Sequence, residues 1–229
     1  MLVVTPPPQA GITECESAVT SSVAILASFI EQNQAIDADK TLSPVGKQNK
    51  KGPLAANAIK ALWRQDDAVA TFGSKVMSKQ ATLFSVPAIA PGNAVQVLSD
   101  RECRDWWRAL PTLERQRVLP KLISGQLPSL AMALMRSPVP LDNDEELVDN
   151  AWRASIRAEN LGEVVDLEAQ NSAVNWAMLL IRRIAAMLAK AGNLGDNAVS
   201  AALGQFDAPD QGPFNVGYTP NAAAFLANR

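Results

Sequence analysis

The sequence predicts an all-α fold, in which a multi-helix body lies between an extended N-terminal segment and an extended C-terminal arm. Three observations lead to this prediction. Apolar residues recur at helical spacing through most of residues 13–204. Few segments alternate between apolar and polar residues, so a large sheet is not expected. Prolines gather near both ends of the chain, where they prevent a continuous helix.

The N-terminal part is expected to be extended first and helical afterwards. Residues 1–12 contain three consecutive prolines, which fix φ and favour an extended polyproline conformation. The first helix is expected at about 13–34, because its apolar residues recur at intervals of four, three and four. These residues are Val19, Val23, Leu26 and Ile30. Residues 37–53 are polar and hold two prolines and two glycines, so we expect a hinge or linker there.

The later helices are predicted from the residues at their ends. Ser99 and Glu102 fit a capping box, Pro128 suits a first helical position, and Asp142 is the expected N-cap of a helix rich in acidic residues. Gly125 follows the end of one helix, and Gly192-Asn193 ends the longest one. Residues 85–97 are expected to form a loop or short strand. The predicted helices after the linker are 53–77 and a little beyond, 99–110, 112–123, 128–136, 143–160, 163–191 and 197–203.

Beyond the helical body, which spans residues 13–204, we expect a docking arm at 205–229. This arm holds 4 of the chain's 12 aromatic residues and three prolines. A disordered tail is normally poor in aromatic residues, so the arm is expected to bind a surface, burying one anchor at a time. That surface belongs either to a partner or to the arm's own body. The expected docking residues are Phe206, Phe214, Tyr218 and Phe225.

The composition excludes several classes of enzyme. The chain contains no histidine, so it has no Ser-His-Asp triad, no Cys-His dyad, no imidazole base and no histidine-bound metal. Its two cysteines, Cys15 and Cys103, are 88 positions apart, which excludes CxxC metal and redox motifs. Nucleophile-elbow, Ser-x-x-Lys, P-loop and dinucleotide-binding motifs are also missing. We therefore expect no enzymatic activity, no cofactor and no bound metal.

Charge is distributed in three blocks. Residues 1–39 hold five acidic and no basic residues, residues 40–136 hold 15 basic and 6 acidic ones, and residues 137–229 hold 6 basic and 12 acidic ones. The basic middle is explained in three ways: by solvated helix faces, by pairing with acidic blocks of the same or another copy, or by phosphate contact. The candidate phosphate contacts are Lys47, Lys50, Lys51, Arg101, Arg104 and Arg108. Nucleic-acid binders usually have a basic isoelectric point, and this chain is acidic.

Two apolar stretches are candidate membrane spans, and neither is expected to be one. Residues 17–30 are too few to cross a bilayer, and the residues before them are acidic, unlike a signal peptide. Residues 174–188 are more apolar, but Arg182 and Arg183 lie near their centre. Each arginine costs about 2.5–3.5 kcal/mol at the middle of a membrane. We therefore expect no membrane span and synthesis in the cytoplasm.

Together these observations favour a non-enzymatic structural or assembly protein of a large symmetric complex. We expect a homo-oligomer, such as a ring, that also contacts neighbouring structural proteins, with nucleic acid as a secondary partner. By analogy, the expected setting is the virion of a tailed phage, with this chain as a head–tail connector or adaptor. The alternative is a small helical nucleic-acid-binding or regulatory module that uses the basic middle segment.

The missing histidine leads to a testable expectation about pH. Unperturbed carboxyl groups titrate near about pH 4 and lysines above about pH 10, so no ordinary side chain changes its charge between about pH 6 and 8. Folding stability depends on pH only where proton binding differs between the folded and unfolded states. The melting temperature, followed by circular dichroism, should therefore stay nearly constant across this range. A shift of many degrees would reveal a carboxyl group or a lysine with a strongly displaced pKa.

Overall fold

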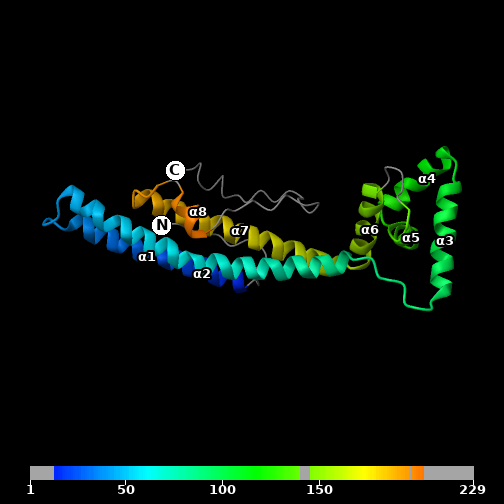
Figure 1. The fold of residues 1–229 in the computed structure, drawn as a ribbon, viewed down its shortest axis with the longest axis horizontal. Coiled ribbons are helices and arrows are strands. Elements are labelled where there is room, and N and C mark those ends of the chain that lie inside the picture. Colours follow the sequence, from blue (N-terminus) through cyan, green and yellow to red (C-terminus); the bar gives the residue numbers. More distant parts are fainter. Residues whose placement is uncertain (1–12, 140–144, 196, 204–229) are drawn as a thin grey trace. The chain divides into compact units, whose positions relative to one another are not determined.

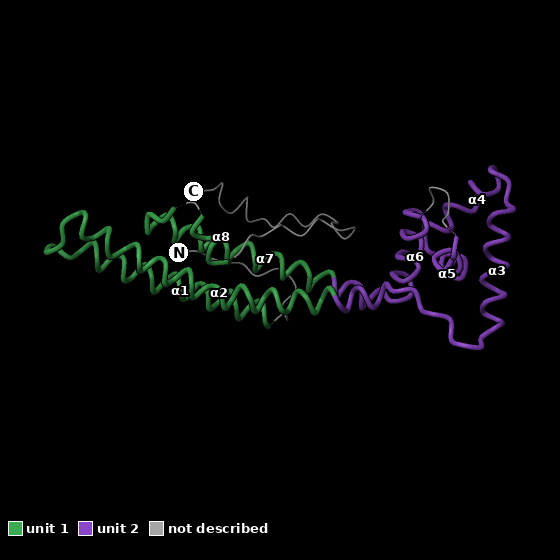
Figure 2. The backbone as a smooth tube through the Cα atoms, in the orientation of Figure 1, with its two compact units in different colours: residues 1–77, 168–229 green, residues 78–167 purple. Residues whose placement is uncertain are grey.

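The all-α prediction is confirmed by the computed structural model, which describes residues 13–139, 145–195 and 197–203. Over these residues the chain forms eight helices and no strand (Figure 1). The predicted N-terminal segment and C-terminal arm lie outside the described residues. The chain divides into two compact units (Figure 2), of which unit 1 is residues 1–77 with 168–229 and unit 2 is residues 78–167.

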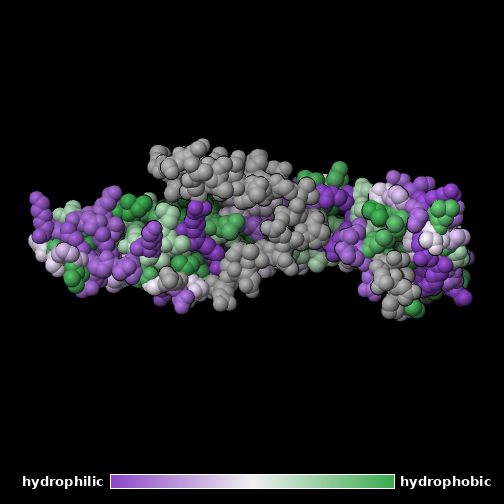
Figure 3. Space-filling model, turned by 90° about the horizontal axis from the view of Figure 1, so that it is seen from above, coloured by the Kyte–Doolittle hydropathy of each residue, from purple (hydrophilic) through white to green (hydrophobic). Residues whose placement is uncertain are grey.

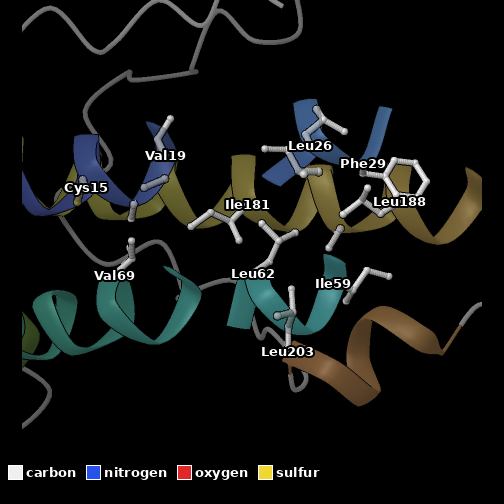
Figure 4. Close-up of a cluster of buried hydrophobic side chains, with 14 of the residues drawn as sticks. Cys15, Val19, Leu26, Phe29, Ile59, Leu62, Val69, Ile181, Leu188 and Leu203 are labelled. Atoms are coloured by element: carbon white, nitrogen blue, oxygen red, sulfur yellow. The ribbon is translucent and has the colours of Figure 1, made fainter. Parts of the chain in front are cut away.

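Four helices build the core of unit 1. They are α1 (Thr13–Ala38), α2 (Pro44–Phe84), α7 (Leu161–Ala191) and α8 (Ala198–Leu203). Each turns an apolar stripe towards the others (Figure 4), and burying one large apolar side chain contributes about 1.5–3 kcal/mol. The labelled core side chains are Cys15, Val19, Leu26, Phe29, Ile59, Leu62, Val69, Ile181, Leu188 and Leu203.

The segment 37–53 is largely helical, in contrast to the linker that its prolines and glycines predict. Only residues 39–43 separate α1 from α2, and Ser43 accepts a hydrogen bond from the N–H of Gly46 at 3.1 Å. Pro44 occupies the first helical position, where a missing N–H costs nothing. Pro53 lies inside the helix but is exposed, so water can satisfy the carbonyl that it leaves without a partner. Helix α2 therefore begins nine residues earlier than predicted.

The end of α7 confirms the predicted Gly192-Asn193 stop signal and separates the roles of its two residues. Asn193 adopts the left-handed conformation, with φ 52°, and the N–H of Leu194 reaches back to the carbonyl of Ala189 at 2.9 Å. Gly192 is required for another reason, because a Cβ at this position would lie 2.4 Å from the Cβ of Ala55 in α2. The absence of a side chain lets α2 and α7 approach closely here.

Unit 2 contains four shorter helices. They are α3 (Ala94–Ala109), α4 (Thr112–Ile123), α5 (Pro128–Met135) and α6 (Glu145–Glu159). Helix α5 packs against α3 and α6, and α4 packs against α5 and α6. The last residues of α2 also belong to this unit. The buried core consists of Trp107, Leu122, Leu130, Ala131, Leu134, Val148, Ala151, Trp152 and Ile156.

The predicted helix ends in this unit are correct in some places and wrong in one. Helix α4 matches the predicted 112–123, and α5 begins at Pro128 as expected. Helix α3 begins five residues before Ser99, because Asn93 accepts a hydrogen bond from the N–H of Gln96 at 3.1 Å and acts as the N-cap. Ser99 therefore lies inside the helix. The predicted N-cap Asp142 lies outside the described residues.

Gly125 ends α4 in the manner that the sequence predicts. It has φ 75°, and two back-directed bonds close the turn: its own N–H reaches the carbonyl of Leu122 at 3.0 Å, and the N–H of Gln126 reaches that of Lys121 at 2.9 Å. A Cβ at Gly125 would lie 2.6 Å from the carbonyl carbon of Ala154 in α6. This glycine is therefore needed both for the turn and for the contact of α4 with α6.

Substitutions at two glycines separate the cost of a positive φ from the cost of a steric clash. Gly92 also has a positive φ, 84°, but nothing lies within 4 Å of the position that its Cβ would take. Gly92→Ala should therefore cost only the conformational term, about 1–2 kcal/mol. Gly125→Ala adds a clash with rigid backbone and should cost at least about 3 kcal/mol. Urea unfolding of both variants measures the difference, and equal losses would show that α6 moves aside readily.

Candidate interaction surface

The first predicted basic cluster lies at the start of α2 and is largely engaged within the protein. Lys51 forms an ion pair with Asp37 at 2.7 Å, and the Nζ of Lys47 donates a hydrogen bond to the backbone carbonyl of Asp37. Positive charge at the C-terminal end of α1 is favourable, because the helix dipole is negative there. Lys50 is exposed. Two of the three lysines thus hold the end of α1 to the start of α2.

The turn between these helices carries its own acidic group. Thr41 donates hydrogen bonds to Oδ1 of Asp39 from its hydroxyl at 2.6 Å and from its N–H at 2.9 Å. These bonds lower the pKa of Asp39, and the nearby charges of Lys50 and Lys47 lower it further. A phosphate approaching this turn would meet two carboxylates beside the lysines. The geometry is that of a closed turn rather than an open anion site.

The arginines of the second predicted basic cluster, on α3, also contact other groups of the same chain. Arg104 donates a hydrogen bond to the carbonyl of Ala133 at 3.2 Å and so joins α3 to α5. Arg101 and Arg108 share the carboxylate of Asp105, at 3.5 and 3.6 Å. Both of these contacts are exposed, and exposed ion pairs contribute at most about 1 kcal/mol each. One arginine is therefore structural, and the other two share a single carboxylate.

The tryptophan pair on α3 is split between the core and the surface. Trp107 is 2% exposed, whereas Trp106 is 48% exposed. The guanidinium group of Arg115 lies 5.2 Å from the centre of the Trp107 ring and donates a hydrogen bond to the Trp107 carbonyl at 3.1 Å. Trp107 therefore cannot stack on a nucleic-acid base. Trp106 alone is available for an external contact.

Helix α3 carries a second apolar stripe, which faces solvent. Val95, Leu98 and Trp106 are 79%, 56% and 48% exposed, and their spacing of three and eight residues places them on one side of the helix. The buried residues Asp100 and Trp107 lie on another side. Figure 3 shows hydrophobic residues at the molecular surface among hydrophilic ones. Val95, Leu98 and Trp106 are referred to below as the α3 surface.

Sequence reasoning misses this surface for a local reason. The predicted capping box at Ser99 leaves Val95 in the loop or short strand predicted for residues 85–97 and Leu98 just before the predicted helix. Asn93 is the signal for the earlier start, because asparagine is as good an N-cap as serine. With the helix begun at Ala94, the sequence shows two apolar faces on one helix.

A buried ion pair holds α3 in place. Asp100, which is 2% exposed, pairs with Arg136 at 3.0 Å and accepts a second bond from the side-chain amide of Gln96 at 2.7 Å. Arg136 also donates to the carbonyl of Pro87 at 2.8 Å. Both carboxylate oxygens of Asp100 are therefore satisfied. The network joins α3, the residues after α5 and the loop before α3.

Unit 1 contains a second buried pair, at the end of its described chain. Arg182 of α7 bonds to Asp66 of α2 at 3.0 Å and to the carbonyl of Leu203, the last residue of α8, at 3.2 Å. Burial raises the pKa of Asp66, and the charge of Arg182 opposes this shift. The described chain is thus anchored at Leu203. The predicted docking residues Phe206, Phe214, Tyr218 and Phe225 lie outside the described residues.

Helix α7 is long and apolar enough, by length and composition, to cross a membrane, and α4 with α5, bent by 101°, passes the same test as a pair. The apolar side chains of α7 also pack in the core of unit 1, where Ala177, Ile181 and Ala185 are fully buried. Arg182 lies in the middle of this stretch and is paired with Asp66. Part of the apolar surface of α7 thus lies in the core of unit 1, whereas Leu179 and Met187 are 50% and 45% exposed.

Titratable and metal-binding chemistry is sparse over residues 13–139, 145–195 and 197–203. Among these residues no three His, Cys, Asp or Glu side chains form a group that could hold a metal ion. Both cysteines are free thiols, Cys15 in unit 1 and Cys103 in unit 2. Burial, together with the charges of Glu14 and Glu16, raises the pKa of Cys15 to about 11. The Cys15 thiol therefore stays protonated at neutral pH and is not a nucleophile.

Comparison with known proteins finds no match: no family model, no curated protein and no solved structure matches this chain. The chemistry of the described surfaces is therefore the guide to function. Of these, the α3 surface is the one whose side chains have no evident use inside their own unit.

Two aspartates on one helix test how α3 is held. Asp100→Ala leaves Arg136 buried without its partner and should cost about 3–5 kcal/mol of folding free energy. Asp105→Ala on the exposed side removes two exposed ion pairs and should change stability by at most about 2 kcal/mol. Chemical denaturation followed by tryptophan fluorescence measures both. Similar small effects in the two variants would mean that the Asp100–Arg136 pair does not hold α3.

Proposed function

We propose that this protein is a non-enzymatic structural protein that assembles with copies of itself into a large symmetric complex. The observation that carries the proposal is the α3 surface. Three large apolar side chains face solvent on a helix that a buried ion pair holds in position. Burying one of them contributes about 1.5–3 kcal/mol, and apolar patches on a soluble surface mark sites of protein contact.

The distribution of the basic side chains favours this proposal over the nucleic-acid-binding alternative. Lys47 and Lys51 are bound to Asp37, and Arg104 is bound to a backbone carbonyl. Arg101 and Arg108 share one carboxylate. Affinity for nucleic acid comes mainly from basic side chains that are free to neutralise phosphates. Of the six candidate phosphate contacts, Lys50 alone forms no hydrogen bond or ion pair with another described residue.

The setting that we propose is the virion of a tailed phage, where the chain acts as a head–tail connector or adaptor. This step is made by analogy with the class of protein that forms symmetric rings through helical bodies and docking arms. In that setting the chain is a homo-oligomeric ring that also contacts neighbouring structural proteins. Neither a cofactor nor a catalytic group enters the proposal.

Two neighbouring residues of α3 test the proposal. Leu98→Glu places a charge on the α3 surface and should reduce the assembled mass measured by light scattering, ideally to that of a monomer. Val97→Glu is the matched control, because Val97 is 49% exposed but lies about 100° around the helix from Leu98. It should leave the mass unchanged. The proposal fails if the unmodified chain is monomeric at every concentration, and a monomer that binds DNA in a salt-sensitive manner would support the alternative.

A further inference from the structure

We propose that the α3 surface binds the C-terminal segment, residues 205–229, of a second copy of this chain. The inference rests on the proposed function, since it names the partner of the same surface. The contact is head-to-tail: the segment that follows Leu203 in one copy lies along Val95, Leu98 and Trp106 of the next.

The charge of the α3 surface argues against a symmetric pairing of two α3 helices. Consider an antiparallel pairing that places Leu98 opposite Trp106 of a second copy. Because Glu102 lies midway between these two residues, the same pairing places Glu102 opposite Glu102 of the second copy. Two facing carboxylates repel each other. A narrow apolar stripe interrupted by an acidic residue suits an elongated ligand better than a copy of itself.

The length of the surface fits an aromatic ligand in an extended conformation. Leu98 and Trp106 are eight residues apart, about 12 Å along a helix. Phe214 and Tyr218 are four residues apart, which spans about 13 Å in an extended chain. The two aromatic side chains can therefore reach the two ends of this part of the surface together. Glycine and proline near them favour an extended over a helical ligand.

Charge complementarity points to the same segment. Asp207 and Asp210 are the acidic residues of 205–229, and they stand between Phe206 and Phe214. On α3, Arg101 and Arg108 share the single carboxylate of Asp105 at 3.5 and 3.6 Å, and Arg108 also donates a hydrogen bond to the hydroxyl of Ser137 at 3.4 Å. Two arginines that share one aspartate leave a net positive charge, which attracts a carboxylate. The segment thus offers aromatic anchors and negative charge to a surface that is apolar and has positive charge at its side.

The resulting contact is heterologous, because it joins two different patches of the same chain. Contacts of this kind build closed rings when the rotation between neighbours closes, and open filaments when it does not. The base of the segment is fixed in unit 1 by the bond from Arg182 to the carbonyl of Leu203. Every copy therefore presents one anchored segment and one α3 surface, which is what a ring requires.

Complementation between two full-length variants tests the contact. The surface variant, Leu98→Glu, keeps its C-terminal segment, whereas the segment variant, with Phe206, Phe214, Tyr218 and Phe225 changed to Ala, keeps its α3 surface. Each alone should be monomeric by light scattering. An equimolar mixture should form a complex of twice the monomer mass, because one intact segment meets one intact surface. With Leu113→Glu, the same change at a residue of α4 that is 61% exposed, assembly should persist without any partner variant.

Circular dichroism and melting of each variant confirm that the helices are intact before the masses are compared. A synthetic peptide of residues 205–229 gives a second readout: it should bind the segment variant by calorimetry, and at least about tenfold more weakly once Leu98→Glu is added. The inference is overturned if the mixture stays monomeric, or if the segment variant assembles like the unmodified chain. An unmodified chain that never assembles overturns the proposed function instead, and the contact with it.

Discussion

The buried ion pair between Asp100 and Arg136 determines where the candidate surface lies. It joins α3 to the chain after α5, and through the carbonyl of Pro87 it also holds the loop that leads into α3. Because both oxygens of Asp100 are bonded, the charge is buried without an unsatisfied acceptor. Ion pairs of this kind add little to stability in themselves, but they allow few alternative arrangements of the helices. The outward direction of Val95, Leu98 and Trp106 follows from that restriction.

The buried pair in unit 1 is less completely satisfied. Oδ2 of Asp66 receives Arg182, whereas Oδ1 of Asp66 has no hydrogen-bond partner among the described residues. This difference agrees with the raised pKa of Asp66, since burial without full hydrogen bonding disfavours the charged carboxylate. Lowering the pH through that pKa relieves the penalty, so protonation of Asp66 favours the folded state. Through Arg182 the pair holds Leu203 in place. Its contribution to the free energy of folding is reduced by the burial of the Asp66 carboxylate.

Most of the candidate basic side chains make contacts within the protein, whereas several apolar side chains face solvent. Most of the basic side chains considered as ligands for phosphate make contacts that hold helix ends together, as Lys51 does with Asp37 and Arg104 with Ala133. Unit 2 also leaves large apolar side chains exposed, among them Val95, Leu98 and Trp106 on α3. Basic side chains that are mostly engaged in internal contacts, beside an exposed apolar stripe, favour a protein partner over a nucleic acid. The proposed assembly contact follows from this combination.

The sequence by itself determined those features whose cause lies within a few residues. Helical spacing predicted the all-α fold, and the stop signals at Gly125 and Gly192-Asn193 predicted two helix ends, because a left-handed residue closes a helix wherever it occurs. Tertiary structure alone decided the rest. Whether Pro53 breaks a helix depends on which side faces water, and which of Trp106 and Trp107 is buried depends on how α3 packs against its neighbours. The start of α3 and the pairing of Asp100 with Arg136, 36 positions away, depend on contacts that no local pattern records.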